Sequence, residues 1–164
     1  MVDFDGALKP TLKFEVGGKS DGGYTKDPAD PGGETKWGIA KRYFPTFDIK
    51  NLTHEQARRV YYTEFWVKYK CDLVPEHLRI TYFDMCIHPG PGRVVRLMQR
   101  AFNSLGGRQL TVDGILGLKT LTASLELPVD RLRMYRLEYY AELVIRIPKK
   151  RKYWNGWKRR ALTV

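Results

Sequence analysis

Apolar residues recur at helical spacing in the first fifteen positions of the chain. Phe4, Leu8 and Leu12 are four residues apart, so they fall on one face of a helix. We therefore expect an amphipathic helix over residues 3–15. Pro10 lies inside this stretch and should remove a backbone hydrogen bond or kink the helix.

The same periodicity predicts further helices along the chain. One begins after Thr53, which forms a capping-box pattern with Gln56, and ends before Cys71. The others are expected at residues 76–87, 93–104, 117–126 and 128–147. Strand-like alternation is short, and the best of it is at Thr35–Ile39. The pattern favours a mainly α fold with at most a small β-hairpin in the N-terminal loop region.

Residues 16–36 show no helical periodicity. This stretch is rich in Gly, Pro and Asp, and it contains the run Asp27-Pro28-Ala29-Asp30-Pro31-Gly32-Gly33. A structureless segment of about twenty residues is unusual in a compact domain and tends to carry function. We therefore expect functional residues in this loop.

The chain has 164 residues, of which 29 are Lys or Arg and 18 are Asp or Glu, so its net charge is +11. Its length and its hydrophobic fraction of 43% are sufficient for one compact domain and exclude a disordered linker. A charge this positive favours polyanionic partners, such as nucleic acid, anionic lipid or an anionic cell-wall polymer.

The sequence contains neither an evident membrane span nor an evident secretion signal. No apolar run approaches the ~18 residues that cross a bilayer, and residues 1–20 lack a signal-peptide apolar core. We expect synthesis in the cytoplasm and release to the cell wall by another route. Cys71 and Cys86 are expected to be free thiols, and an oxidising periplasm would favour a disulfide. The sequence implies no metal and no organic cofactor.

Glu15 is the first candidate for catalysis. It closes the predicted N-terminal helix between Phe14 and Val16, so partial desolvation would keep its carboxyl protonated as a general acid. A second carboxylate on a facing loop would stay ionised, which is the arrangement that glycoside hydrolysis needs. Alternatively, Glu15 is a solvated helix-end residue, and the loop aspartates hold turns beside Pro and Gly. Spacing alone favours this alternative.

Longer motifs change this balance. The N-terminal ones are Phe4-x-x-Ala7-Leu8-x-x-x-Leu12-x-x-Glu15 and Gly22-Gly23-Tyr24-x-x-Asp27-Pro28-x-Asp30-Pro31-Gly32-Gly33-x-Thr35-x-x-Gly38-Ile39. The C-terminal ones are Val112-Asp113-Gly114-Ile115-x-Gly117-x-x-Thr120-Leu121 and Gly156-Trp157-x-x-Arg160. Together they resemble glycoside hydrolase family 108, whose members are phage-type N-acetylmuramidases with a lysozyme-like helical fold and a C-terminal peptidoglycan-binding region.

The resemblance covers nearly the whole chain and implies a peptidoglycan hydrolase, specifically a phage endolysin. Such an enzyme cleaves the β-1,4 bond between N-acetylmuramic acid and N-acetylglucosamine. On this basis we expect residues 1–90 to form the catalytic region. Residues 91–164 would form a helical peptidoglycan-binding region packed on it as one compact unit.

By position, the resemblance implies that Glu15 is the catalytic acid. The family usually has Glu directly before Gly-Gly-Tyr, whereas here residues 16–21 intervene and Asp21 takes that place. Asp21 is therefore a rival acid, although the helix register favours Glu15, because a carboxyl on a rigid helix is easier to preorganise. The wider lysozyme-like group implies that Asp30 is the ionised partner, with Asp27 as its competitor, and that Thr35 positions a water molecule.

Four further residues are candidates for substrate binding. Tyr24 and Trp37 would stack on sugar rings, or alternatively pack under the loop. Asp84 either faces the cleft or pairs with an arginine in the core. His88 stands where many members of the family have Asn, and it is a candidate substrate contact.

Residues 146–160 are strongly basic. They hold eight Lys or Arg and no acidic residue, interleaved with Tyr153, Trp154 and Trp157. Such a segment suits an anionic outer-membrane or wall polymer, a single-stranded nucleic acid, or a solvated end that its tryptophans dock on the core. We expect a monomer whose partner is the peptidoglycan glycan strand, without specific nucleic-acid binding. The competing function is a non-catalytic peptidoglycan-binding module of the same fold.

Overall fold

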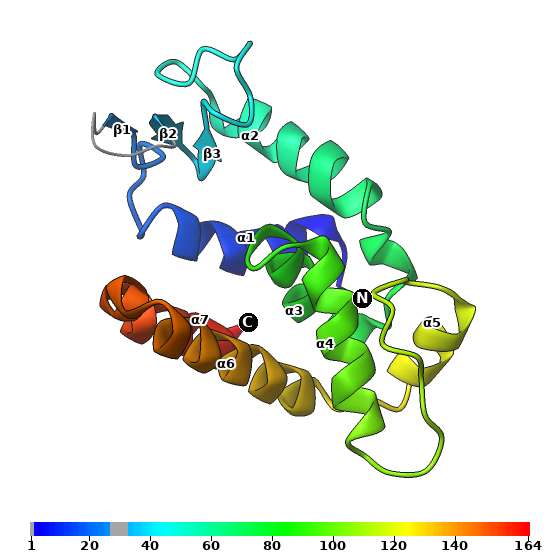
Figure 1. Ribbon diagram of the computed structural model, residues 1–164. Coiled ribbons are helices and arrows are strands. Elements are labelled where there is room, and N and C mark those ends of the chain that lie inside the picture. The colour runs from blue at the N-terminus through cyan, green and yellow to red at the C-terminus, as the bar shows by residue number, and fades with distance from the viewer. Residues whose placement is uncertain (1, 27–32) are drawn as a thin grey trace.

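The computed structural model describes residues 2–26 and 33–164, and in these ranges the mainly α fold is confirmed (Figure 1). The α-helices are α1 (Phe4–Glu15), α2 (His54–Tyr61), α3 (Glu76–Ile87), α4 (Pro91–Asn103), α5 (Leu118–Ser124), α6 (Val129–Arg146) and α7 (Trp154–Thr163). A π-helical segment, Tyr62–Val67 (η1), continues α2. Short 3-10 segments lie at Cys71–Leu73 (η2) and Pro148–Tyr153 (η3).

Helix α1 forms where the apolar spacing predicts it. The Asp3 carboxylate caps its N-terminus by accepting a hydrogen bond from the Gly6 amide at 2.9 Å. Leu8 and Leu12 are buried, and the helix runs through Pro10 to Glu15. The capping box at the start of α2 is also present. The Asp3 cap marks the start of α1, and the apolar spacing accounts for its buried face.

Helix α3 lies at the centre of the core. Its side chains at Leu78, Tyr82, Phe83 and Met85 are almost completely buried. Helices α1, α4 and α6 all contact it, and Figure 1 shows α3 between α1 and the pair formed by α6 and α7. The run Thr81–Cys86 is buried on every side, which is expected for a helix at the centre of a core.

The strands form one small antiparallel sheet, ordered β1 (Thr25–Lys26), β2 (Glu34–Lys36) and β3 (Ile39–Ala40). Thr35 pairs with Thr25 on one side and with Ala40 on the other. The sheet lies beyond the C-terminal end of α1 (Figure 1). The β2–β3 turn, which holds Trp37 and Gly38, thereby comes to the end of α1.

The C-terminal helix α7 was not predicted from the sequence. Its apolar residues Trp154, Trp157, Ala161 and Val164 do follow helical spacing, but six Lys or Arg between residues 149 and 159 obscured that pattern. Helix α4 also starts earlier than expected, at Pro91, because proline suits the first turn of a helix. Helix α7 packs along α6.

Three further observations bear on function. Cys71 and Cys86 are both buried and both free thiols. Within residues 2–26 and 33–164, no helix is long and apolar enough to cross a membrane. In the same ranges, no group of three or more His, Cys, Asp or Glu side chains lies close enough together to hold a metal ion.

Candidate active site

Glu15 ends α1 directly beside the β2–β3 turn. Its side chain is 19% exposed, so the carboxylate is reachable but not freely solvated. Gly38 packs against it with φ +74°, a left-handed conformation that favours glycine. A Cβ atom at Gly38 would lie 2.9 Å from Glu15 Cβ and 3.0 Å from Glu15 Oε2, and it would also collide with the Tyr61 hydroxyl. Only glycine permits this approach.

Tyr61 of α2 supports the turn through a hydrogen bond to Trp37. The buried Tyr61 hydroxyl donates a hydrogen bond to the Trp37 carbonyl at 3.0 Å. Burial is the main cause that raises the pKa of Tyr61 well above its usual value, and the nearby Glu15 carboxylate adds to it. Tyr61 therefore stays a neutral donor. Trp37 and Tyr61 together hold Gly38 against Glu15.

Arg160 of α7 binds the Glu15 carboxylate directly. Its Nη2 lies 2.6 Å from Glu15 Oε1 and 2.8 Å from Asp84 Oδ1. The Arg160 side chain is only 10% exposed. Burial lowers the pKa of Arg160, but the Asp84 and Glu15 carboxylates outweigh this effect, and the pKa is raised overall. One guanidinium, from the far end of the sequence, thus fixes the orientation of Glu15.

Asp84 is the buried end of this cluster. Its carboxylate is 0% exposed and accepts hydrogen bonds from Arg160 and from the buried Arg136 of α6. Burial raises the pKa of Asp84, but the two guanidinium groups outweigh it and lower the pKa overall. The expected substrate contact at Asp84 is therefore corrected, because the carboxylate has no exposed surface. Its other predicted role, an ion pair in the core, is the one observed.

His88 directly follows the last residue of α3 and contacts this cluster through Arg136. Its Nδ1 lies 2.7 Å from the Tyr140 hydroxyl, and its carbonyl accepts a hydrogen bond from Arg136 at 3.0 Å. Its ring packs against Trp157 with centroids 5.6 Å apart. Burial, with Arg160 and Arg136 nearby, lowers the pKa of His88 to about 4. The imidazole is thus neutral near pH 7, and part of it stays exposed.

The remaining candidates lie in the sheet region. Thr35 is half-buried in the middle of β2. The Tyr24 hydroxyl donates to Glu34 Oε1 at 3.2 Å. The Trp37 ring is half-buried, since its Nε1 donates to the Leu52 carbonyl at 3.2 Å and it packs on His54 at 5.0 Å. These contacts match the packing alternative for Trp37 more closely than a free stacking face.

The candidate loop carboxylates differ in what the structure describes. Asp30 and Asp27 lie outside the described residues. Asp21 is exposed, and its Oδ1 accepts a hydrogen bond from the Gly23 amide at 3.0 Å, which closes a local turn. Asp21 therefore has the turn-forming contact that the sequence offered as an alternative for these aspartates.

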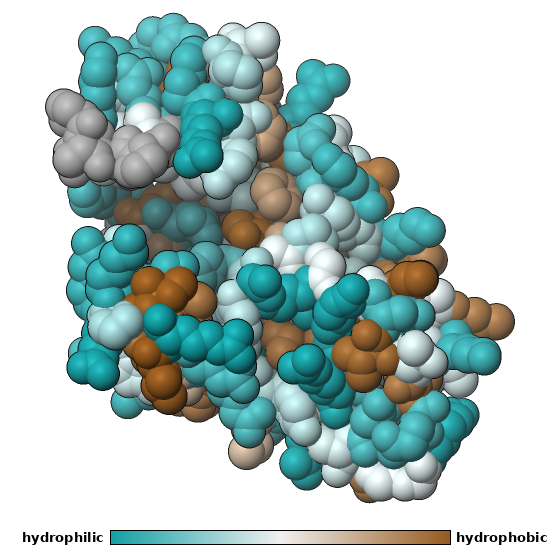
Figure 2. Space-filling view, in the orientation of Figure 1, coloured by the Kyte–Doolittle hydropathy of each residue, from teal (hydrophilic) through white to brown (hydrophobic). Residues whose placement is uncertain are grey.

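The surface is hollowed near Gly38, the glycine that packs against Glu15. Figure 2 shows a depression between the segment that carries the strands and the C-terminal helices. A groove of about 440 Å³ begins at Gly38 and runs between β3 and the α3–α4 junction. Aromatic side chains line it, namely Tyr43, Phe44, Tyr61, Phe65 and Tyr69. Apolar ring faces of this kind suit the faces of sugar rings.

Sequence reasoning did not single out Arg160, Arg136, Tyr61 or Gly38 as members of the site. Arg160 and Gly38 both stand in the motifs quoted above, so a signal existed for them. Arg136 gave no such signal, because an arginine within an amphipathic helix usually faces solvent. Its partner Asp84, on a helix of apolar residues, was the cue that a buried cation was needed.

Two known protein families match consecutive ranges of this chain. Residues 16–90 match the family described as Glycosyl hydrolase 108, and residues 93–162 match the family described as Predicted Peptidoglycan domain. The solved structure of Brucella abortus SagA is similar over 97% of this chain and 89% of that chain, with a TM-score of 0.71 and 27% sequence identity. No functionally curated protein is similar enough in sequence to match. Glu15 immediately precedes the first matched range.

Proposed function

We propose that this chain is an N-acetylmuramidase that uses Glu15 as its acid, because residues 16–90 match the Glycosyl hydrolase 108 family and residues 93–162 match a predicted peptidoglycan domain. The two matches support a glycoside hydrolase that acts on peptidoglycan. The proposal adds the bond, the β-1,4 link between N-acetylmuramic acid and N-acetylglucosamine. The observation that carries it is the partly buried Glu15 carboxylate, held by Arg160 and Gly38 beside an aromatic groove.

In this mechanism Glu15 first takes up a proton from solvent, and its carboxylic acid form then donates that proton to the leaving glycosidic oxygen. Arg160, at 2.6 Å, then stabilises the carboxylate that remains. Asp84 and Arg136 keep Arg160 in place, because they are buried and bonded to one another. Gly38 covers one side of the carboxylate and limits its access to water.

Asp30 and Thr35 complete the proposed mechanism. Asp30 would remain ionised and stabilise the positive charge of the oxocarbenium-like transition state, and Thr35 would position the attacking water. Thr35 lies on β2, three residues before Gly38, so the same sheet would carry the water site and cover the acid.

Two observations support Glu15 over Asp21. Glu15 is fixed by an ion pair at the end of a twelve-residue helix, whereas Asp21 is exposed and closes a turn. A preorganised carboxyl in a restricted space is the better acid catalyst.

The proposal is tested by measuring reducing ends released from purified sacculi. Glu15→Gln should lower this rate by at least about 100-fold, because a general acid contributes that much, while circular dichroism shows a retained fold. Asp21→Asn is the matched control and should keep most activity. A variant Glu15→Gln that lyses sacculi at nearly the wild-type rate contradicts the proposal. If wild-type protein binds sacculi and releases no reducing ends, the chain is a binding module.

The basic end of the chain is proposed to hold the enzyme at the cell envelope. Lys149, Arg151 and Lys152 are exposed, as is Ile145 at the end of α6. Cations beside an exposed apolar side chain suit an anionic envelope polymer.

A further inference from the structure

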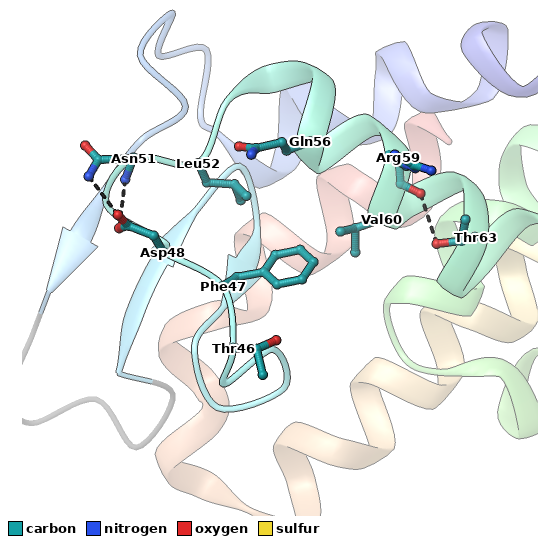
Figure 3. Close-up of a pocket in the computed structure, with 9 residues that line it drawn as sticks. All are labelled: Thr46, Phe47, Asp48, Asn51, Leu52, Gln56, Arg59, Val60 and Thr63. Carbon is teal, nitrogen blue, oxygen red and sulfur yellow. Dashed lines mark hydrogen bonds between the residues drawn. The ribbon is translucent and has the colours of Figure 1, made fainter.

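The protein has a second cavity, which residues of α2 help to line. It has a volume of about 660 Å³ and opens between the loop that precedes α2 and the helix itself (Figure 3). Its lining residues are Thr46, Phe47, Asp48, Asn51, Leu52, Gln56, Arg59, Val60 and Thr63. None of them belongs to the aromatic groove that begins at Gly38. The cavity is therefore a separate site.

The cavity is nevertheless close to the acid through two short connections. Val60 lines it, and the next residue, Tyr61, supports the Trp37–Gly38 turn with its hydroxyl. Leu52 also lines it, and the Leu52 carbonyl accepts the hydrogen bond from Trp37 Nε1. The cavity is therefore connected to the turn beside Glu15 through Leu52, which bonds to Trp37, and through Val60, the neighbour of Tyr61.

Two polar side chains of the lining, Arg59 and Gln56, offer hydrogen-bond donors to the cavity. Arg59 is exposed, and its guanidinium has no hydrogen-bond or ion-pair partner within the described part of the chain. Gln56 uses its Oε1 to cap α2, which leaves its amide N–H groups for a ligand. Such a set favours a ligand that is rich in carbonyl and carboxylate oxygens.

Asp48 is the one acidic side chain among the lining residues, and its carboxylate already accepts hydrogen bonds from Asn51. Both of its oxygens accept hydrogen bonds from Asn51, at 2.8 Å and 3.3 Å, as the dashed lines in Figure 3 indicate. These bonds lower the pKa of Asp48, and the cations Lys41 and Lys50 nearby add to the effect. Those two lysines also offset its charge, so the rim of the cavity is positive overall.

The floor of the cavity is apolar. Phe47 points into the space between the loop and α2, toward Val60, and Leu52 lies beside it (Figure 3). Small alkyl side chains would fill this floor without any hydrogen-bond requirement. The ligand that matches both parts is a short acidic peptide with small apolar side chains.

We propose that this cavity binds the short peptide attached to N-acetylmuramic acid, with a peptide carboxylate at Arg59 and the alanine methyl groups on Phe47, Leu52 and Val60. The inference rests on the proposed function, since it places the glycan of the same substrate at Glu15. A neutral sugar fits less well, because it offers no carboxylate to the Arg59 guanidinium.

The first test is titration of the whole protein with a synthetic L-Ala–γ-D-Glu–diaminopimelate–D-Ala tetrapeptide. We expect saturable binding, with NMR shifts confined to residues 46–52 and 56–63. Arg59→Glu should weaken it by at least about tenfold, as expected for the loss of a charged hydrogen bond. Arg42→Ala, an exposed arginine outside the lining, is the matched control and should bind as wild type does. Absence of saturable binding by the wild-type chain overturns the proposal.

The second test compares two substrates, intact sacculi and glycan strands from which an amidase has removed the peptides. Arg59→Glu should raise KM for intact sacculi and leave the rate on stripped strands unchanged, with an unchanged melting temperature. A lower rate on stripped strands would mean that the cavity holds sugar, and the proposal would fail. Peptide binding by the Glu15→Gln variant is measured separately. If that variant binds peptide and still cleaves sacculi, the assignment of the acid fails and the peptide site stands.

Discussion

Arg160 bonds to two carboxylates that differ sharply in exposure. The Asp84 side chain has no exposed surface, whereas the Glu15 side chain is 19% exposed. The buried carboxylate fixes the guanidinium, and the guanidinium in turn orients the catalytic candidate. Arg160 therefore acts by positioning Glu15, and its loss should lower both the folding stability and the rate of turnover.

We expect Arg160→Met to lower the free energy of unfolding by about 3 kcal/mol, because removing one partner leaves a buried charge poorly compensated. Activity on sacculi should fall as well. Arg159→Met is the control, since Arg159 is exposed and should change stability by less than about 0.5 kcal/mol. Urea denaturation measures both variants. Equal stabilities for the two would contradict the structural role of Arg160.

The titration of His88 should be visible in the pH dependence of stability. Its pKa is lowered from 6.5 to about 4, mainly by burial. Between these two values the unfolded chain binds the proton and the folded chain does not, so stability falls as the pH drops from 6.5 to 4. His88→Asn removes this difference. Wild type should lose about 1–3 kcal/mol more than the variant across this window.

Urea denaturation of wild type and His88→Asn at pH 7 and at pH 4.5 measures this loss. His54 and His77 are common to both proteins and cancel in the comparison. Parallel stability profiles would show that His88 does not carry the effect.

At the scale of elements, the β2–β3 turn matters more than its length suggests. It comprises Trp37 and Gly38, yet it forms one wall of the site and connects to both α1 and α2. No residue with a Cβ atom could take the place of Gly38 without displacing Glu15 or Tyr61. This makes the approach of the turn to α1 directly testable.

Gly38→Ala should reduce activity on sacculi by about 100-fold, because its Cβ would displace the Glu15 side chain and small misplacements in a site cost that much. Gly33→Ala is the matched control. Gly33 also has a positive φ, +70°, but an added Cβ there meets nothing closer than 3.8 Å. Both variants therefore carry a similar backbone strain of about 1 kcal/mol. Equal activity of the two variants would exclude the steric role of Gly38.

The predictability of the elements follows from how each is stabilised. Helices α1 and α3 were predicted within a residue, because apolar periodicity and capping residues act locally. The helix expected from Thr53 to just before Cys71 consists of α2, which ends at Tyr61, and the π-helical η1, which ends at Val67. Helix α7 was missed, because burial of Trp154, Ala161 and Val164 against α6 stabilises it against a strongly charged local sequence. The Arg160–Glu15 ion pair could not be predicted from the sequence for a related reason. No local pattern relates residues 145 positions apart, whereas Glu15 alone could be found from its helix and its motif.

At the scale of the whole molecule, the two matched regions share their most buried charges. Asp84 comes from the range that matches the glycosyl hydrolase, and Arg136 and Arg160 come from the range that matches the peptidoglycan domain. Helix α3 also contacts α4 and α6 across this division. Separating the regions would leave charges in apolar surroundings without their partners.

We therefore expect a single cooperative unfolding transition for the whole chain. Differential scanning calorimetry should give equal calorimetric and van't Hoff enthalpies, the mark of a two-state unit. Two resolved transitions, or an intermediate that retains only residues 1–90, would contradict this expectation.

The contact between Glu15 and Arg160 has a consequence for recombination between related enzymes. A chimera that joined residues 1–90 to the second region of another protein would keep Glu15 but not necessarily the cation that orients it. Exchange of wall specificity by simple domain shuffling should therefore yield inert hybrids, unless the donor segment ends in a helix with an arginine at the equivalent place. Selection would thus be expected to transmit the two regions together, as an inseparable pair.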